Sequence, residues 1–452
     1  MKKLAILMVL LWLLTACLPA NQGRVPAAPA VETPSDNYQE AGQPVEEAPA
    51  ADSPAEQALA AEAEDPEPGA AEAATTPTDT PHVIQQDGSL AVSNSQSQSE
   101  LPGEESNPLP NPIAASGPDA FPAGTNPLTG LPAVDPELLA LPPALVSVTN
   151  FPVSSRPPAG LSFAPLVFEL YIGEGMTRFL ALFYGEYPSL TPQVSSDASV
   201  TTDNQPEIGP VRSGRLPYQA IRQLYNGFLV MASASPDVKE DTTDFTNIYG
   251  SDKDDINSAF IDVTRLHSIA EANRNALGAN LTGNAFDPQP PAGGQKAESL
   301  WSFYKSNNQV QWGYDPASSK YLRYQDRADG TGEFYPSTDR LTGEQLASDN
   351  VIVLFVKHNV LNSDRTLIDI DLLYSKGQAY LLRDGQLYPV LWTTLGGEYE
   401  KSTGLLRPIR FIDSNGNPIP LKPGNTWVEI VDVSTDFQEV EPGGWKARFY
   451  SP

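Results

Sequence analysis

Three arginines near one expected helix could bind a small anion. Arg212 and Arg215 lie just ahead of a helix expected to begin near residue 217, where the first backbone amides lack partners and the helix dipole favours negative charge. Arg178 adds a third guanidinium, and such groups can hold a carboxylate or a phosphate through two parallel hydrogen bonds. The sequence therefore predicts a ligand-binding site at Arg178, Arg212 and Arg215. The alternative is that these arginines pair with Glu169 and Glu174 and only fix the connection between strand and helix.

Glu169 and Glu174 are also the candidate catalytic residues. Glycoside hydrolysis needs two carboxyl groups, an acid and a base or nucleophile, about 5 to 10 Å apart. On a regular strand, a spacing of five residues points the two side chains to opposite faces, although Gly173 could bend the chain and reunite them. A hydrolase acting on cell-envelope glycan is therefore the second hypothesis, behind a binding role without catalysis.

Other residue patterns give weaker indications of chemistry. Three short motifs occur in the order found in penicillin-binding proteins, but the third has one residue too many and the gaps between them are too short: Ser302–Lys305, Ser348–Asn350 and Lys401–Gly404. His267 and His358 lack the close spacing that metal ligands require. The sequence predicts neither a metal site nor a cofactor.

Cys17 indicates where the protein resides. Two lysines and an apolar run over residues 4–14 precede it, and this run is too short to span a bilayer, as expected for a secretory signal. The sequence Leu-Thr-Ala-Cys over residues 14–17 resembles the lipobox of bacterial lipoproteins, in which the cysteine receives a lipid. Cys17 is the only cysteine, so the folded part cannot contain a disulfide. We expect a lipid anchor (palmitate among its acyl chains) on the extracytoplasmic face of a bacterial cell membrane.

A long acidic segment follows the cysteine. Residues 18–125 are rich in Pro, Ala and Glu and contain eighteen acidic residues but one basic residue, Arg24. Such a composition buries too little apolar surface to offset the entropy lost on folding, and it predicts a disordered stalk. The whole chain has a formal net charge of −28 and no basic cluster, which argues against a nucleic-acid partner.

The elements that must position these residues follow the stalk. Over residues 126–290 we expect a mixed α/β domain, with one helix that begins near Pro217 and carries Ile221, Leu224 and Tyr225 on one face, and another at 265–277. Apolar strands are expected at 144–149, 161–170, 177–184 and 227–234. A segment dense in proline and glycine, residues 287–295, predicts a linker.

Residues 291–452 predict a β-rich domain. One short helix is expected at 297–306, followed by strands rich in β-branched and aromatic residues at 351–356, 366–374, 378–382, 387–392 and 427–433. Asp384-Gly385 and Asn415-Gly416 are typical hairpin turns. The predicted fold class is therefore α+β.

Several short blocks in one order resemble the YerB-like bacterial lipoproteins. In the N-terminal half they are residues 126–132, 156–161, 167–169, 175–179 and 208–215; in the C-terminal half they are residues 341–344, 350–353, 383–385 and 423–427. One departure is that the family pattern has an acidic residue where this chain has Gly173, with Glu174 following it. The resemblance implies a lipid anchor, a variable stalk and two paired domains whose biochemical role is uncharacterised. The expected partners are the membrane, through Cys17, and an envelope polymer or protein.

Overall fold

The computed structural model describes residues 113–189, 205–275 and 278–452, all within one compact unit. Cys17, the signal segment and residues 18–112 of the expected stalk lie outside the described residues. Residues 113–125, assigned to the stalk from the sequence, contact the folded body: Ser116 and Phe286 exchange backbone hydrogen bonds, and the rings of Phe121 and Phe286 are 6.2 Å apart.

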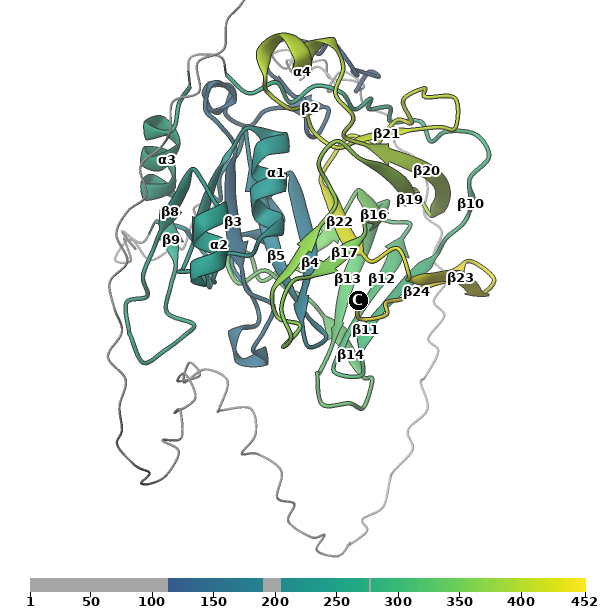
Figure 1. The fold of residues 1–452 in the computed structure, drawn as a ribbon. Coiled ribbons are helices and arrows are strands. Elements are labelled where there is room, and N and C mark those ends of the chain that lie inside the picture. The colour runs from purple at the N-terminus through teal and green to yellow at the C-terminus, as the bar shows by residue number, and fades with distance from the viewer. Residues whose placement is uncertain (1–112, 190–204, 276–277) are drawn as a thin grey trace, which may run out of the picture. The chain divides into compact units, whose positions relative to one another are not determined.

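An eleven-stranded sheet forms the centre of the molecule (Figure 1). Its strands, in spatial order, are β10 (Gln295–Lys296), β20 (Gln386–Thr393), β19 (Lys376–Arg383), β16 (Asn350–Phe355), β22 (Thr426–Val431), β4 (Leu166–Gly173), β5 (Met176–Phe183), β3 (Ala144–Val148), β7 (Phe228–Met231) and β8 (Phe245–Asn247), with β21 (Arg410–Ile412) paired to β20. Strand β22 runs parallel to both β16 and β4. The main sheet therefore continues across the expected boundary near residue 290.

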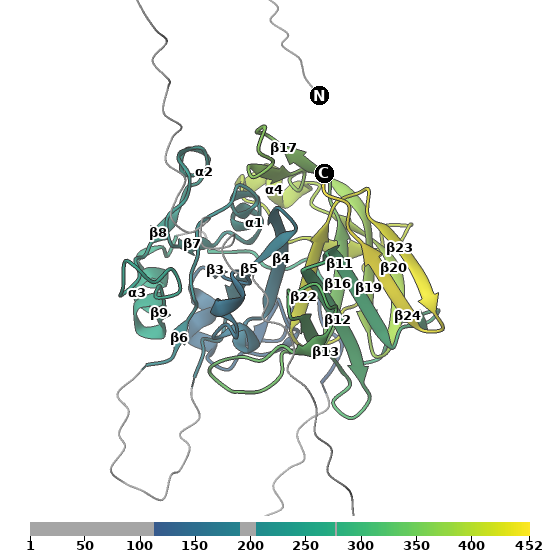
Figure 2. The same cartoon turned by 90° about the horizontal axis from the view of Figure 1, so that it is seen from below.

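A second, seven-stranded sheet comes entirely from the C-terminal half. Its strands, in spatial order, are β14 (Phe334–Pro336), β13 (Lys320–Asp326), β12 (Asn308–Asp315), β11 (Ser299–Lys305), β24 (Gly444–Arg448) and β23 (Asp436–Glu441), with β15 (Ala347–Ser348) paired to β13. Figure 2 shows β11, β12 and β13 beside β16 and β22 of the main sheet, and the buried side chains of both sheets form one core.

The helix expected at 297–306 is wrong, because this segment is strand β11. Leu300, Ser302 and Tyr304 are buried while Trp301 and Phe303 are half-buried on the other face, which is the period of a strand. The inward serine concealed this alternation, since a small polar residue does not mark a core position in the sequence.

The remaining elements are short. The three small strand pairs are β1 (Thr125–Asn126) with β2 (Leu131–Pro132), β6 (Glu207–Ile208) with β9 (Ile261–Asp262), and β17 (His358–Val360) with β18 (Ile368–Ile370). The α-helices are α1 (Pro217–Tyr225), α2 (Pro236–Asp241), α3 (Val263–Ala272) and α4 (Glu398–Thr403), and the 3-10 helices are Pro136–Ala140, Val153–Ser155 and Leu161–Phe163. In the described ranges, no helix combines the length and hydropathy of a membrane span.

The expected fold class holds only in its coarser form. The described chain is mostly β sheet with few helices, and a separate mixed α/β N-terminal domain is not confirmed. The strands of the first half, β3, β4, β5, β7 and β8, belong to the same sheet as strands of the second half. The reason is that β4 pairs with β22 and has no free edge.

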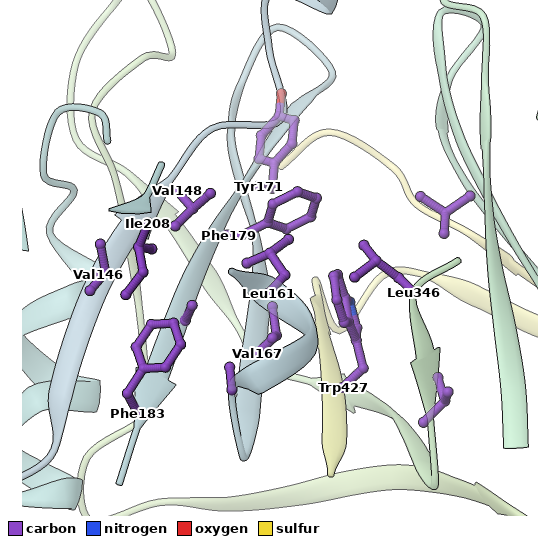
Figure 3. Close-up of a cluster of buried hydrophobic side chains, with 14 of the residues drawn as sticks. Val146, Val148, Leu161, Val167, Tyr171, Phe179, Phe183, Ile208, Leu346 and Trp427 are labelled. Carbon is purple, nitrogen blue, oxygen red and sulfur yellow. The ribbon is translucent and has the colours of Figure 1, made fainter. Parts of the chain in front are cut away.

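Both faces of the central strands are buried, which explains their continuous apolar sequences. Phe168 of β4 lies in a core cluster with Ile221 of α1, whereas Val167 faces the opposite side. On that side Val167 belongs to the same cluster as Trp427 of β22 and Leu346, two residues of the C-terminal half (Figure 3). Strands buried on both faces need apolar residues at every position rather than at alternate ones.

The expected turns are present. Strands β19 and β20 form a hairpin through Asp384 and Gly385, which have φ values of 52° and 69°, the left-handed conformation that this turn needs. Asn415 and Gly416 lie in a turn closed by the backbone amide of Gly416 donating to the carbonyl of Asp413. Residues 287–294, within the expected linker, form neither helix nor strand.

Candidate functional site

The structure brings the three predicted arginines together on the α1 side of the main sheet. Arg178 on β5 points to the same face as Leu180 and Leu182, whose side chains pack in the core shared with α1. It is 8% exposed, and its Nη1 donates to the carbonyl oxygen of Ser213, 2.9 Å away. Its buried Nε has no hydrogen-bond acceptor among the residues that the structure describes.

Arg212 and Arg215 come from the loop that leads into α1, and both are half-buried. Arg212 Nη2 donates to Asn257 Oδ1 at 3.2 Å, and Arg215 Nη1 donates to the carbonyl of Gly214 at 3.0 Å. Burial lowers the pKa of Arg178 well below its usual value, and the nearby charges of Arg215 and Arg212 lower it further. This set, the arginine cluster, concentrates positive charge around a buried guanidinium.

Glu169 does not neutralise the arginine cluster, because its side chain lies on the opposite face of the sheet. It is fully buried and forms an ion pair with Arg323 of β13, at 3.0 Å between Nη2 and Oε2. Thr177 Oγ1 donates to Glu169 Oε1 at 2.8 Å, and Trp427 Nε1 donates to Oε2 at 3.2 Å. Glu169 therefore connects the two sheets.

Glu429 lies beside Glu169 in this buried network. The two residues are register partners on the parallel strands β22 and β4, and both are fully buried. Glu429 accepts hydrogen bonds from Trp312 Nε1, at 2.7 Å, and from Ser302 Oγ. Burial, and secondly the charge of Glu169, raises the pKa of Glu429 to about 7. No local pattern in the sequence indicates this pair of glutamates, which are 260 residues apart.

Glu174 is not brought to Glu169. It lies exposed at the turn between β4 and β5 with a φ of 55°, and its carbonyl oxygen accepts a hydrogen bond from Lys305 Nζ at 3.0 Å. The two predicted carboxylates therefore form no pair in this structure.

The other motifs are similarly dispersed. Ser302 and Lys305 lie three residues apart on a strand, so their side chains point to opposite faces. Lys401 is exposed on α4. His267 lies on α3. His358 is buried, with its Nδ1 3.5 Å from Asp432 Oδ2, and its backbone amide donates to the same oxygen at 2.9 Å. Within the described ranges, no three His, Cys, Asp or Glu side chains gather where they could hold a metal ion.

A cavity of about 220 Å³, the interdomain pocket, opens between the two sheets. Residues from both halves of the chain line it: from the first half Asn150, Val153, Arg156, Pro157, Pro158 and Phe179, and from the second Arg323, Gln325, Tyr335, Pro336, Ser337, Thr338 and Leu346. Clefts between parts of a fold are common ligand sites. The sequence does not predict this pocket, because its local patterns do not identify strand β13. In this strand Tyr321, Arg323 and Gln325 alternate with less buried residues and point inward.

Two arginines give the interdomain pocket a polar wall. Arg156 donates from Nε to the carbonyl of Asn150 at 2.9 Å and from Nη1 to the carbonyl of Asp326 at 3.1 Å. Its Nη2 and the Nε of Arg323 are buried and have no hydrogen-bond acceptor in the described part of the chain. Burial lowers the pKa of Arg156, while the Tyr335 side chain acts in the opposite direction.

Comparison with known proteins agrees with this architecture. Residues 128–277 match the N-terminal domain, and residues 301–428 the C-terminal domain, of a protein family of unknown function, DUF3048. The "Putative lipoprotein YerB" of Bacillus subtilis (strain 168) is 25% identical over 323 residues, 68% of this chain and 85% of the relative. The crystal structure of the Bacillus subtilis YerB protein matches with a TM-score of 0.51 over 68% of this chain and 96% of that one, at 25% identity. This chain therefore belongs to the YerB-like family, in which N- and C-terminal DUF3048 domains are paired.

Proposed function

We propose that this protein is a lipid-anchored binding protein of the bacterial cell envelope, exposed outside the cytoplasm, that captures an anionic envelope component at the arginine cluster. The lipobox-like sequence at Cys17 supports the anchor, and a relative that is named as a lipoprotein agrees with it. An acidic stalk repels an anionic membrane surface and would hold the folded body away from it.

The observation that carries the binding role is the unmatched charge of Arg178. Its guanidinium is buried, its Nε has no acceptor among the described residues, and the neighbouring charge that acts most strongly on it belongs to Arg215, with Arg212 acting in the same direction. Burying a cation without a counter-charge is costly in free energy. The presence of Arg178 is therefore best explained if a ligand supplies the negative charge. Three neighbouring guanidiniums favour a multiply charged group such as phosphate.

A hydrolase using Glu169 and Glu174 receives less support. Glu169 is sealed in the core by its ion pair with Arg323, and Glu174 is on an exposed turn. General acid and base residues must both reach the substrate.

Thermal unfolding of the full chain with inorganic phosphate tests the binding role. We expect phosphate at about 50 mM to raise the melting temperature above that in sodium chloride of equal ionic strength, because a ligand that binds the native state stabilises it. The variant Arg178→Met should melt roughly 2 °C or more above the wild type without phosphate, since the unmatched buried charge is gone, and should lose the phosphate effect.

Arg212→Gln should also lose most of the phosphate effect, whereas Arg265→Gln, on the exposed face of α3, should keep it. The binding role is wrong if phosphate and chloride stabilise the wild type equally, or if Arg178→Met and Arg212→Gln respond to phosphate as the wild type does.

A further inference from the structure

The interdomain pocket is a second site with its own chemistry. It lies on the face of the main sheet opposite the arginine cluster, because Phe179, which lines it, and Arg178 are neighbours on strand β5 and point to opposite sides. A ligand bound here would therefore be independent of one bound at Arg178.

Of the two arginines that line the pocket, only Arg323 has a direct ion pair with a described carboxylate. Arg323 is paired with Glu169, which offsets its charge. Arg156 forms no ion pair with any described carboxylate, although its Nη1 contacts the backbone carbonyl of Asp326. The charges of Arg156 and Asp326 act on each other: that of Asp326 raises the pKa of Arg156, against the larger effect of burial. The buried Nη2 of Arg156 has no hydrogen-bond acceptor among the described residues, and an anion in the pocket could accept from it.

The guanidinium of Arg156 is also held in place. Its carbon lies 4.5 Å from the centroid of the Phe151 ring, and two backbone carbonyls and the Tyr335 hydroxyl accept its hydrogen bonds. Because the group is pre-oriented, it loses little freedom when a planar anion binds.

Apolar and polar side chains share the remaining walls, and the space is small. Val153, Phe179 and Leu346 contribute apolar surface beside the arginines. The volume of about 220 Å³ is below the ~300 to 1,000 Å³ usual for pockets that hold drug-sized ligands. The pocket therefore suits one small apolar group that carries the anion.

We infer that the interdomain pocket binds a carboxylate attached to a small apolar group, with Arg156 as the residue that recognises the carboxylate. Two sources share this chemistry: a free carboxylic acid and the C-terminal residue of a peptide. A carboxylate matches the planar fork of a guanidinium and can accept a hydrogen bond from the Nη2 of Arg156, which has no acceptor among the described residues.

Calorimetric titration of the full chain tests this inference with three probes: N-acetyl-alanine, its amide, and a tripeptide with a C-terminal alanine carboxylate. We expect the acid to bind and the amide to bind at least about tenfold more weakly, since the amide has no charge for Arg156. Tighter binding of the tripeptide than of N-acetyl-alanine identifies a peptide end as the ligand, whereas equal binding identifies a free acid.

Variants locate the site. Arg156→Gln should weaken acid binding by about tenfold or more. Arg340→Gln is the matched control: Arg340 donates to the carbonyls of Pro157 and Ser155 on the same loop but does not line the pocket, so binding should be unchanged.

Val153→Trp provides a test that does not depend on Arg156. Val153 is 41% exposed at the pocket wall, so the larger ring should occupy the cavity and block binding without a change of charge. The inference is overturned if acid and amide bind equally, if neither binds the wild type, or if Val153→Trp, folded as judged by its melting curve, binds the acid as well as the wild type. If Arg178→Met loses phosphate binding but still binds the acid, the two sites bind their ligands independently. Failure of the proposed function can then be distinguished from failure of this inference.

Discussion

Glu429 is a buried acid whose ionisation should control stability. Its pKa is about 7 in the folded protein because of burial and of neighbouring Glu169, compared with an ordinary value of 4.5 in the unfolded chain. Between these values the folded state binds more protons, so the free energy of unfolding should fall as pH rises from about 4.5 to about 7 and then level off. Burial raises the pKa of Tyr304, which interacts with Glu429, well above its ordinary value, so this hydroxyl does not titrate in this window.

Glu429→Gln should remove this dependence. Glutamine keeps the acceptor oxygen for Trp312 but cannot ionise, so the variant should be more stable than the wild type at about pH 8, by up to ~3 kcal/mol, and similar to it at about pH 5. Denaturant unfolding at both pH values measures the difference, with exposed Glu441→Gln as the control. An unchanged pH slope in Glu429→Gln would mean that another group is responsible.

At the scale of elements, the pairing of β4 with β22 decides how the chain folds. Strand β4 pairs with β5 on one side and with β22 on the other, and all residues of β4 and β22 are buried. Separation of the chain near residue 290 would expose an apolar edge on each half, and such edges aggregate. Large contacts between distant segments also make unfolding cooperative.

We therefore expect residues 113–290 and 291–452 to be insoluble or unfolded when each is expressed alone, and to form a soluble complex when expressed together. Size-exclusion chromatography and circular dichroism of the separate and co-expressed halves provide the measurement. A soluble, cooperatively unfolding 113–290 fragment would contradict the expectation. The matched control is a cut within the Asn415-Gly416 turn, where residues 413–417 are exposed or half-buried and close a local hairpin.

For the whole molecule, we propose that lipid attachment at Cys17 fixes the position of the folded body. The sequence before it predicts cleavage and lipid attachment, and two or more acyl chains on one residue give stable membrane anchoring. Mass spectrometry of the mature N-terminal peptide should show a diacylated Cys17 as residue one, and Cys17→Ser should shift the protein out of the membrane fraction. An unmodified Cys17 in membrane-free extract would contradict the proposed location.

The sequence by itself determined those features that local residue patterns encode. The apolar run before Cys17, the acidic composition after it, the continuous apolar strands β3, β5 and β7, and the Asp384-Gly385 turn each depend on neighbouring residues or on segment composition. The order of family motifs likewise identified the YerB-like family, because it needs no knowledge of contacts.

Only the tertiary structure decided which distant groups meet. The ion pair of Glu169 with Arg323 spans 154 residues, and the Glu429 carboxyl beside it depends on β22 lying between β16 and β4. In strand 299–305, Ser302 faces the core and donates a hydrogen bond to buried Glu429. Glu429 is distant in the sequence, so the local pattern did not reveal that a serine occupies a core position there. The interdomain pocket exists because two sheets from different parts of the chain pack without filling the space between Arg156 and Arg323. Burial and pairing across long sequence separations are properties of the packed chain, and they therefore fix the charges and the cavities on which binding depends.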